Sequence, residues 1–292
     1  MKTSPKRPGR HRKPGDLKIR VSPGVGFCSG VKRAIKMALE AAAHANGDIY
    51  SYGPLIHNPE VVEKLREVGV RPLVRLGKGG GLLVIRSHGV SPKALAAARR
   101  KGYEIVDATC PFVRVAQEHA KHLHRLGYEV VIVGEKLHPE VKAIRGCVPG
   151  RSVVVENATQ AKRLKFGRRV GIIAQTTIPV DTFASVVSQV ARDAREILVF
   201  NTICSETARR QARARRLAAE VDVLLVVGGR NSANTARLED QCRSICRATH
   251  QVETVAEIDA RWFKCGSAVG IVTGASTPKW LVDSIVNDLK KR

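Results

Sequence analysis

The chain has 292 residues, 43% of them hydrophobic, which is enough to bury a substantial core in two or three compact units. No apolar run approaches the roughly 18 to 20 residues that span a bilayer, and the N-terminus lacks an apolar secretory segment, so we expect a cytoplasmic protein without membrane spans. Its 50 Lys and Arg residues against 26 Asp and Glu give a net charge of +24, which can favour phosphorylated substrates, acidic protein partners or nucleic acid as ligands, although a solvated basic surface is the simpler interpretation.

Residues 1–16 form a basic segment that is interrupted by proline and glycine. The stretch "MKTSPKRPGRHRKPG" contains six Lys and Arg residues and no acid, so most of the net positive charge belongs to the rest of the chain. Such a composition predicts a disordered tail. Nucleic-acid binding, if present, is expected to be weak and to involve this tail.

From residue 17 onward, one pattern occurs three times. In each unit a cysteine opens a helix: Cys28 in "GVGFCSGVKRAIKMALEAA", Cys110 in "DATCPFVRVAQEHAKHL" and Cys204 in "NTICSETARRQARARRLAAE". Each helix is followed by an apolar run that ends in a polar cluster, then by a second helix and a second such run. The paired runs cover residues 49–62 and 81–92, 128–141 and 169–179, and 221–235 and 268–278.

Strands that alternate with helical stretches of about ten to fifteen residues predict parallel βαβ units. The expected fold class is therefore α/β, with three small parallel-sheet lobes. We expect these lobes to span residues 17–109, 110–200 and 201–292.

The polar clusters and the three helix-opening cysteines all fall at predicted strand ends. Loops at the carboxyl ends of parallel strands form binding sites, because helix N-termini and free backbone amides converge there. Lobes arranged around a pseudo-threefold axis would bring Cys28, Cys110 and Cys204 together at the centre. Three thiolates can bind zinc, which usually takes a fourth protein ligand, or three irons of a 4Fe-4S cluster whose fourth iron stays open.

The remaining cysteines lie outside this pattern. Seven cysteines are too sparse for a disulfide scaffold in a chain of this length. The other four are expected to be core or surface thiols: Cys147, Cys242, Cys246 and Cys265.

An ordered set of motifs resembles one known family. The set is "GFCSGVKRAI", "YGPLIHNPEVV", "IRSHGV", "DATCPFV", "HPEV", "QTT", "NTIC" followed by "RRQ", "GGRNSANT" and "TGASTP", spread over residues 18 to 290. It resembles the 4-hydroxy-3-methylbut-2-enyl diphosphate reductases, the last enzymes of the methylerythritol phosphate route to isoprenoids. The resemblance implies a pseudo-threefold trefoil around one 4Fe-4S cluster with an open iron and three cysteine ligands, Cys28, Cys110 and Cys204.

The resemblance also implies the reaction and the electron donor. The hydroxyl of (E)-4-hydroxy-3-methylbut-2-enyl diphosphate is removed reductively, and isopentenyl diphosphate and dimethylallyl diphosphate are formed. The electrons come from a small carrier, typically ferredoxin or flavodoxin.

Loss of a hydroxyl requires a Lewis acid and a proton source, and the "HPEV" motif offers Glu140 with His138 two residues before it. Glu140 is the expected proton donor, with His138 beside it in the catalytic set. Thr176 of "QTT" resembles the hydroxyl that relays the proton and orients the substrate oxygen. Outside this motif context, an exposed loop carboxylate would be the simpler interpretation of Glu140.

The diphosphate needs hydrogen-bond donors, and the sequence contains neither a P-loop lysine nor a GxGxxG motif that would indicate a nucleotide. Imidazole, hydroxyl and amide groups at strand ends and helix starts are the expected ligands. These substrate-binding candidates are His57, His88, His138, Thr176, Ser232, Asn234 and Ser276.

Two residues depart from the family pattern. Many members read Asn-Ser-Ser-Asn where this chain has "NSAN", so Ala233 removes one hydroxyl, a loss on the order of 1 kcal/mol. Glu206 stands where a small residue is usual, and we expect it to face outward or to pair with Arg209 or Arg210.

Two rival interpretations remain at this stage. A quinolinate synthase-type enzyme also uses three lobes and three cysteines, although the set "HNPE", "HPEV", "QTT" and "NSAN" argues against it. A basic nucleic-acid-binding protein with a structural metal would interleave aromatic and basic residues, but aromatic residues make up only 4% of this chain.

Overall fold

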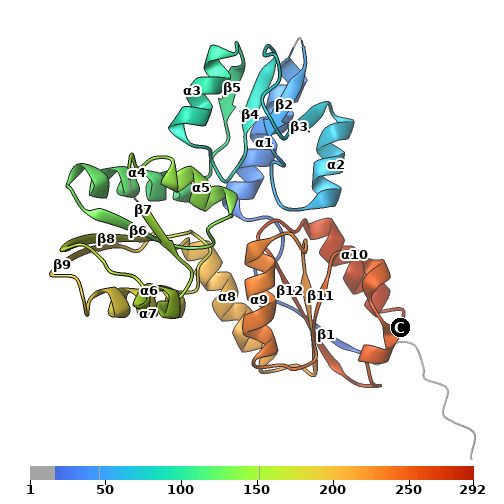
Figure 1. Ribbon diagram of the computed structural model, residues 1–292. Helices are drawn as coiled ribbons and strands as arrows, with labels where there is room; N and C mark the ends of the chain where they lie inside the picture. The colour runs from blue at the N-terminus through green and yellow to red at the C-terminus, as the bar shows by residue number, and fades with distance from the viewer. Residues whose placement is uncertain (1–16, 46, 151) are drawn as a thin grey trace, which may run out of the picture.

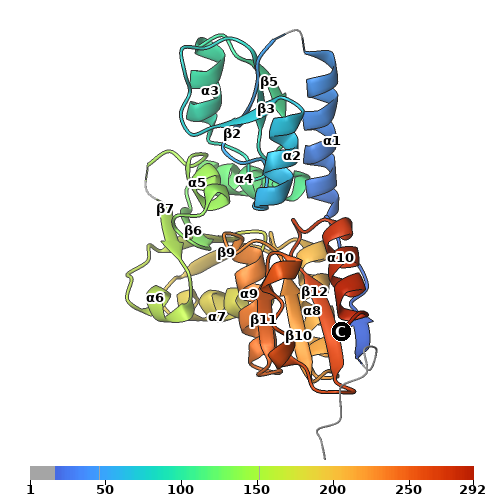
Figure 2. The same cartoon turned by 90° about the vertical axis from the view of Figure 1, so that its right-hand side faces the viewer.

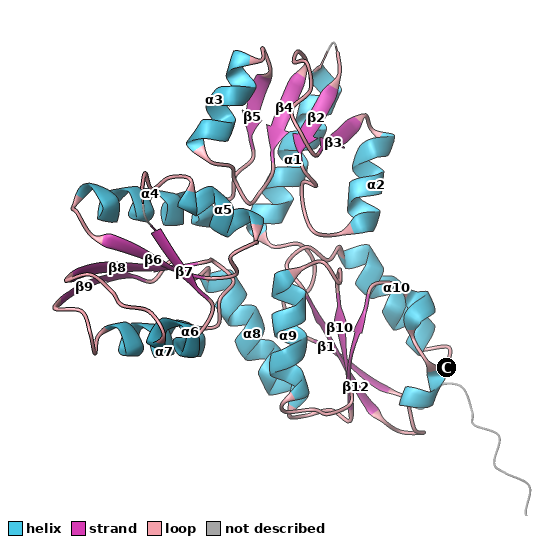
Figure 3. Cartoon of the chain, viewed as in Figure 1, coloured by secondary structure: helices cyan, strands magenta, loops and turns pink. Residues whose placement is uncertain are grey.

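The computed structural model describes residues 17–45, 47–150 and 152–292, so the predicted basic tail lies outside the described residues. The described chain forms three lobes that meet at the centre of the molecule (Figure 1). Each lobe contains one four-stranded sheet with helices packed against it (Figure 3). The predicted α/β fold with three parallel-sheet lobes is confirmed.

All strand pairs are parallel, and the three sheets share one strand order. From one edge to the other, the sheets consist of β3 (Val70–Leu73), β2 (Ile49–Tyr52), β4 (Leu82–Ile85) and β5 (Glu104–Asp107) in the first lobe, β7 (Ser152–Val155), β6 (Glu129–Val133), β8 (Arg169–Ala174) and β9 (Glu196–Phe200) in the second, and β11 (Thr249–Val252), β10 (Val223–Val227), β12 (Ala268–Thr273) and β1 (Lys18–Val21) in the third.

Helices separate most consecutive strands, as parallel pairing requires, and three of them lead from one sheet to the next. They are α1 (Ser29–His44), α2 (Pro59–Glu67), α3 (Pro92–Arg100), α4 (Pro111–Arg125), α5 (Pro139–Arg145), α6 (Ala158–Lys162), α7 (Val180–Val190), α8 (Ser205–Ala218), α9 (Ala233–Arg243) and α10 (Lys279–Leu289), with two 3-10 turns at Val255–Glu257 and Ala260–Trp262.

The central strands are covered on both faces, which explains their continuous apolar sequences. In β10 (VLLVV), Leu225 and Val227 belong to the cluster on one face, and Leu224 and Val226 belong to the cluster on the other. Successive side chains of a strand point to opposite faces, so this one segment supplies two hydrophobic cores.

The predicted first lobe, residues 17–109, is wrong at its start. Strand β1 pairs with β12 of the third lobe, with Lys18 opposite Ala268 and Val21 opposite Ile271. The ladder extends beyond the strand, because the Ser22 amide donates to the Ile271 carbonyl at 2.9 Å. The two views agree that this N-terminal strand lies in the third sheet, while α1 lies in the first lobe (Figures 1 and 2).

With β1 in the third sheet, all three lobes connect to the next lobe in the same way. In each sheet the edge strand next to β12, β4 or β8 carries the chain into the next lobe, so β1 leads to α1, β5 to α4 and β9 to α8. Cys28, Cys110 and Cys204 lie in these three crossings, and the crossings converge at the centre of the trefoil (Figure 1).

Across the described part of the chain, no helix combines the length and the apolar character that crossing a bilayer would require.

Candidate active site

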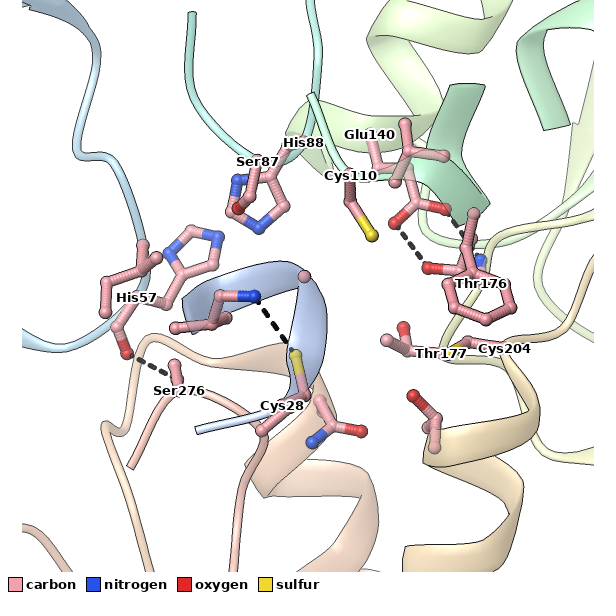
Figure 4. A pocket seen from close by; sticks show the side chains of 18 of the residues that line it. Cys28, His57, Ser87, His88, Cys110, Glu140, Thr176, Thr177, Cys204 and Ser276 are labelled. Atoms are coloured by element: carbon pink, nitrogen blue, oxygen red, sulfur yellow. Dashed lines mark hydrogen bonds between the residues drawn. The ribbon is translucent and has the colours of Figure 1, made fainter. Parts of the chain in front are cut away.

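A pocket with about 710 Å³ of empty space lies where the three lobes meet (Figure 4). Every residue that the sequence predicted for cofactor, acid–base or substrate contacts lines it: Cys28, His57, His88, Cys110, His138, Glu140, Thr176, Cys204, Ser232, Asn234 and Ser276. The fold therefore brings together residues that are as far as 248 positions apart in the sequence (276 − 28). Among the described residues that line this pocket, none is Lys or Arg.

The three cysteines are the N-cap residues of α1, α4 and α8. Cys28 Sγ accepts a hydrogen bond from the Val31 amide at 3.4 Å, and a helix N-terminus favours negative charge. A Cβ atom built at Gly30 would lie 2.6 Å from Cys110 Sγ and 3.9 Å from Cys28 Sγ. Glycine thus leaves open the space between these two sulfur atoms.

Burial disfavours the ionised, thiolate form of these cysteines unless a cation is nearby. It raises the pKa of Cys110 to about 11 and also raises the pKa of Cys28, and the neighbouring thiols add to both shifts. A metal centre would reverse this cost, because coordination deprotonates a thiol outright. Three converging thiols, helix N-termini and a cradle that a Cβ would fill fit a metal cofactor.

Glu140 is fully buried and bonded to the "QTT" turn. The Thr176 amide donates to Glu140 Oε1 at 2.6 Å, and the Thr176 hydroxyl donates to Oε2 at 2.9 Å (Figure 4). Burial raises the pKa of Glu140 to about 7, although both Thr176 bonds and the charge of Arg237 oppose the shift. The carboxyl can therefore hold a proton near neutral pH and pass it along the hydrogen bond to the Thr176 hydroxyl.

Three histidines form a cluster in the same pocket. The ring centroid of His57 lies 4.6 Å from that of His88 and 5.8 Å from that of His138. The centroids of His88 and His138 are 5.4 Å apart. Burial lowers the pKa of all three imidazoles, that of His138 to about 3. His57 Nε2 and His88 Nδ1 are buried without a hydrogen-bond partner in the described structure, so the cluster presents neutral rings with free nitrogen atoms.

Three imidazoles this close could hold a metal ion, but one hydrogen bond favours an anion instead. The Glu140 amide donates to His138 Nδ1 at 3.1 Å, so this neutral ring must carry its proton on Nε2. A protonated Nε2 donates a hydrogen bond to an oxygen atom and cannot bind a metal. The cluster is therefore better suited to phosphate oxygens than to a cation.

The third lobe adds small polar groups. Ser232 is the N-cap of α9 and accepts from the Thr235 amide at 3.3 Å, while Asn234 lies in the first turn. Ser276 donates to the His57 carbonyl at 3.2 Å and so joins the third lobe to the first. Ala233 lines the pocket at the position of the missing hydroxyl.

Glu206 lies beside the start of α1. Its Oε2 accepts from the Ser29 amide at 3.1 Å and from the Ser29 hydroxyl at 2.8 Å, and its Oε1 accepts from Arg210 at 3.4 Å. The expected pairing with Arg210 is confirmed. The carboxylate thus caps a helix N-terminus, where a negative charge is favourable.

Sequence reasoning missed Arg237. Its guanidinium is 14% exposed and donates to Thr177 Oγ1 at 2.7 Å and to Glu135 Oε1 at 2.6 Å. It thereby connects α9 to the turn that holds Thr176. The only sequence signal was its position one helical turn after Asn234, and that spacing does not reveal a partner in another lobe.

The fold and the site together define a class of protein: an α/β enzyme of three lobes whose central pocket combines three thiols, a buried acid and three histidines. The family model described as LytB protein matches residues 19–290. The chain therefore belongs to the LytB family, whose similar curated members are named 4-hydroxy-3-methylbut-2-enyl diphosphate reductase.

Two such members illustrate the similarity. The reductase of Geobacter metallireducens is 47% identical over 276 residues, which cover 94% of this chain and 98% of that protein. The reductase of Pelobacter propionicus is 47% identical over 271 residues, which cover 92% and 96%.

Solved structures match as well. A structure described as (E)-4-hydroxy-3-methyl-but-2-enyl diphosphate reductase, the terminal enzyme of the non-mevalonate pathway, is 41% identical, with a TM-score of 0.70 and coverage of 94% of this chain and 99% of that one. The E-1-hydroxy-2-methyl-but-2-enyl-4-diphosphate reductase of Plasmodium falciparum is 27% identical, with a TM-score of 0.87 and coverage of 94% and 88%. By these relationships the chain is an oxidoreductase of this reductase family.

Proposed function

We propose that the protein removes the hydroxyl of (E)-4-hydroxy-3-methylbut-2-enyl diphosphate by a two-electron reduction and forms isopentenyl diphosphate and dimethylallyl diphosphate. The observation that carries this proposal is one pocket that contains three thiols, the Glu140–Thr176 pair and the histidine cluster. Each group matches one requirement of the reaction: a redox centre, a proton source and an anion site.

The redox centre is proposed to be one 4Fe-4S cluster held by Cys28, Cys110 and Cys204. Three thiolates leave one iron without a protein ligand. When bound, the cluster supplies single electrons and a Lewis-acidic iron with an open coordination position. Gly30 supports this assignment because a larger residue would fill the space beside two of the sulfur atoms.

The proton is proposed to start on Glu140. Its raised pKa of about 7 keeps a proton available at neutral pH, and the Thr176 hydroxyl lies 2.9 Å from the carboxyl. When Glu140 is protonated, this hydrogen bond reverses and the threonine hydroxyl can donate into the pocket. The leaving oxygen would receive the proton by this relay and depart as water.

The diphosphate is proposed to lie against the histidine cluster and the start of α9. His138 offers its Nε2–H, His57 and His88 have unpartnered nitrogen atoms, and Asn234 and Ser276 add an amide and a hydroxyl. These neutral groups offer hydrogen-bond contacts to the anion, and none of the described residues that line the pocket is Lys or Arg. Ser232 lies at the N-terminus of the same helix, where negative charge is favoured.

The electron donor is proposed to be an acidic one-electron carrier of the ferredoxin or flavodoxin type in the cytoplasm. The net charge of +24 supports this choice, because opposite charges speed such encounters.

An anaerobic assay tests the function. The purified protein, reconstituted with iron and sulfide, is mixed with a chemical reductant and the substrate, and both five-carbon diphosphates are followed. Formation of both products is the expected result. A protein that carries its cluster and reduces it, yet makes neither product, would overturn the proposed substrate.

A further inference from the structure

A second cavity lies between the first and second lobes, on the outer side of the histidine cluster. It has about 570 Å³ of empty space, part of it open to solvent, and is lined by Tyr52, Gly53, Leu73, Val74, Arg86, Gly89, Val90, Ser91, Ala94, Pro139, Lys142 and Ala143. Its two ionic residues are both cations, and none of the described residues that line it is Asp or Glu. We call this cavity the interlobe cleft.

The interlobe cleft is separate from the central pocket. Arg86 lines the cleft, whereas His88, two residues later, lines the pocket. In the same way, Pro139 faces the cleft and His138 faces the pocket. The wall between the two sites therefore consists of two short loop segments.

The first and second lobes touch at Ser91, one of the residues that line the cleft. A Cβ atom built at Gly146, the C-cap of α5, would lie 2.2 Å from Cβ of Ser91, the N-cap of α3. Glycine permits this close approach, so the distance between the first-lobe and second-lobe sides is set by direct packing.

Arg86 is a partly buried cation without a counter-charge. Its Nε is buried and has no hydrogen-bond partner, and the guanidinium makes no ion pair within the described ranges of the chain. A Cβ atom built at Gly53 would lie 2.8 Å from Arg86 Nη1, so the absence of a side chain at Gly53 leaves space for the guanidinium. Charges that are shielded from water are normally paired, so the unpartnered Nε of Arg86 leaves room for an anionic partner.

Lys142 supplies the second cation from the opposite side. It lies on α5, is exposed, and has no acidic partner among the residues that the structure describes. Ser91 adds a hydroxyl at the start of α3 and Tyr52 adds a phenol. Two cations with hydroxyl groups, in a cleft without carboxylates, make a complementary environment for a tetrahedral oxyanion.

We propose that the interlobe cleft binds a phosphate-type anion between Arg86 and Lys142. The anion provides the counter-charge that the partly buried guanidinium lacks, and Arg86 and Lys142 donate charge-assisted hydrogen bonds to it. The site does not depend on the proposed function, because its residues differ from those of the central pocket.

Calorimetric titration of the reconstituted protein with inorganic phosphate, in buffer free of phosphate and sulfate, tests the site. Lys142→Ala and Arg86→Gln should each weaken binding about tenfold or more, the usual effect of losing a charge-assisted contact. Lys162→Ala, a matched control on the surface of the same lobe, should leave binding unchanged. Equal affinity in all four proteins, or no binding to the native protein at millimolar phosphate, would overturn the proposal.

Two further titrations separate the possible locations and sources of the anion. Asn234→Ala alters the central pocket only, so phosphate binding that is lost in this variant and kept in Lys142→Ala would place the anion in the pocket and refute the cleft site. Inorganic diphosphate is then compared with phosphate in Asn234→Ala. If diphosphate binds more tightly than phosphate and this binding is lost on Lys142→Ala, the natural ligand of the cleft is a phosphorylated metabolite. If phosphate binds more tightly and is lost on Lys142→Ala, the ligand is free phosphate.

Thermal unfolding provides a readout that does not depend on calorimetry. Arg86→Met removes an unpaired buried charge, so in phosphate-free buffer its Tm should equal or exceed that of the native protein. The rise in Tm that phosphate causes in the native protein should be smaller in this variant, because the anion binds it more weakly. A variant with a lower Tm that keeps the full phosphate-dependent rise would contradict the role of Arg86.

Discussion

Cys110 illustrates how a single residue combines a local and a global role. Locally it ends a loop and caps α4, a position that its sequence context predicts. Globally it lies beside two thiols from other lobes, and burial then raises its pKa to about 11. A thiol that resists ionisation by itself becomes a good ligand only when a cation is present.

Serine at any of the three central cysteines should abolish cluster retention. The hydroxyl occupies nearly the same space but is a poor ligand for iron, so Cys28→Ser, Cys110→Ser and Cys204→Ser should lose most bound iron and visible absorbance after reconstitution. Cys242→Ser is the matched control, because this thiol is buried in the core of the third lobe. Full iron loading in any of the first three variants would remove that residue from the ligand set.

Glutamine at Glu140 should keep the cluster and lower turnover by about 100-fold or more, because it removes the proton and keeps the shape. The donor acts in its protonated form, so native turnover should decline as pH rises through about 7, the raised pKa of Glu140. Steady-state kinetics from pH 6 to pH 9, roughly two units above this pKa, would show that decline. Unchanged turnover in Glu140→Gln would rule out the carboxyl as the donor.

At the scale of elements, α9 connects the proposed diphosphate ligands to the turn that holds the proposed proton donor. Its first turn lines the pocket with Ser232 and Asn234, and one turn later Arg237 reaches across to the second lobe. Arg237 donates to Thr177, the residue after Thr176 in the turn that binds Glu140. Movement of this helix would therefore disturb both the proposed diphosphate ligands and the turn that holds the proposed proton donor.

Methionine at Arg237 should lower kcat about tenfold or more while the cluster is retained. The change removes the bonds to Thr177 and Glu135, and small errors in the position of a proton donor are costly. Arg243→Met is the matched control on the same helix, since Arg243 pairs with Glu239 at the exposed face. Equal loss of kcat in both variants would mean that general destabilisation of α9, and not the contact with the turn, causes the effect.

The crossings between lobes are also features of this scale. The strand before each cysteine-capped helix lies in the sheet of the preceding lobe. The first and second lobes are therefore continuous from their first helix to their edge strand, whereas the third lobe takes its edge strand, β1, from the N-terminal side of the chain. The segment 17–22 could have been assigned correctly by comparing it with the strands before Cys110 and Cys204. Both of those strands are the last of their lobes, which makes the N-terminal strand the last of the third.

At the scale of the whole molecule, the net charge of +24 acts outside the central pocket, whose described lining has no Lys or Arg. Reduction by an acidic carrier should therefore slow about tenfold or more as salt is raised from low to physiological ionic strength. Stopped-flow reduction would measure this, with an uncharged small reductant as the control that salt leaves unaffected. A flat salt dependence with the acidic carrier would reject electrostatic steering.

The sequence by itself determined the α/β class, the three cysteine-capped helices and the residues of the central pocket. The class and the helices follow from local chemistry, because strand and helix patterns depend on neighbouring residues and polar groups at strand ends face one edge of a parallel sheet. The roles expected of the pocket residues follow from the ordered motifs that resemble the reductase family. Only the tertiary structure decided the contact of Arg237 with Thr177 and the unpaired charge of Arg86 in the interlobe cleft. Each of these depends on groups in different lobes, and their distance in space has no signature in the spacing of residues along the chain.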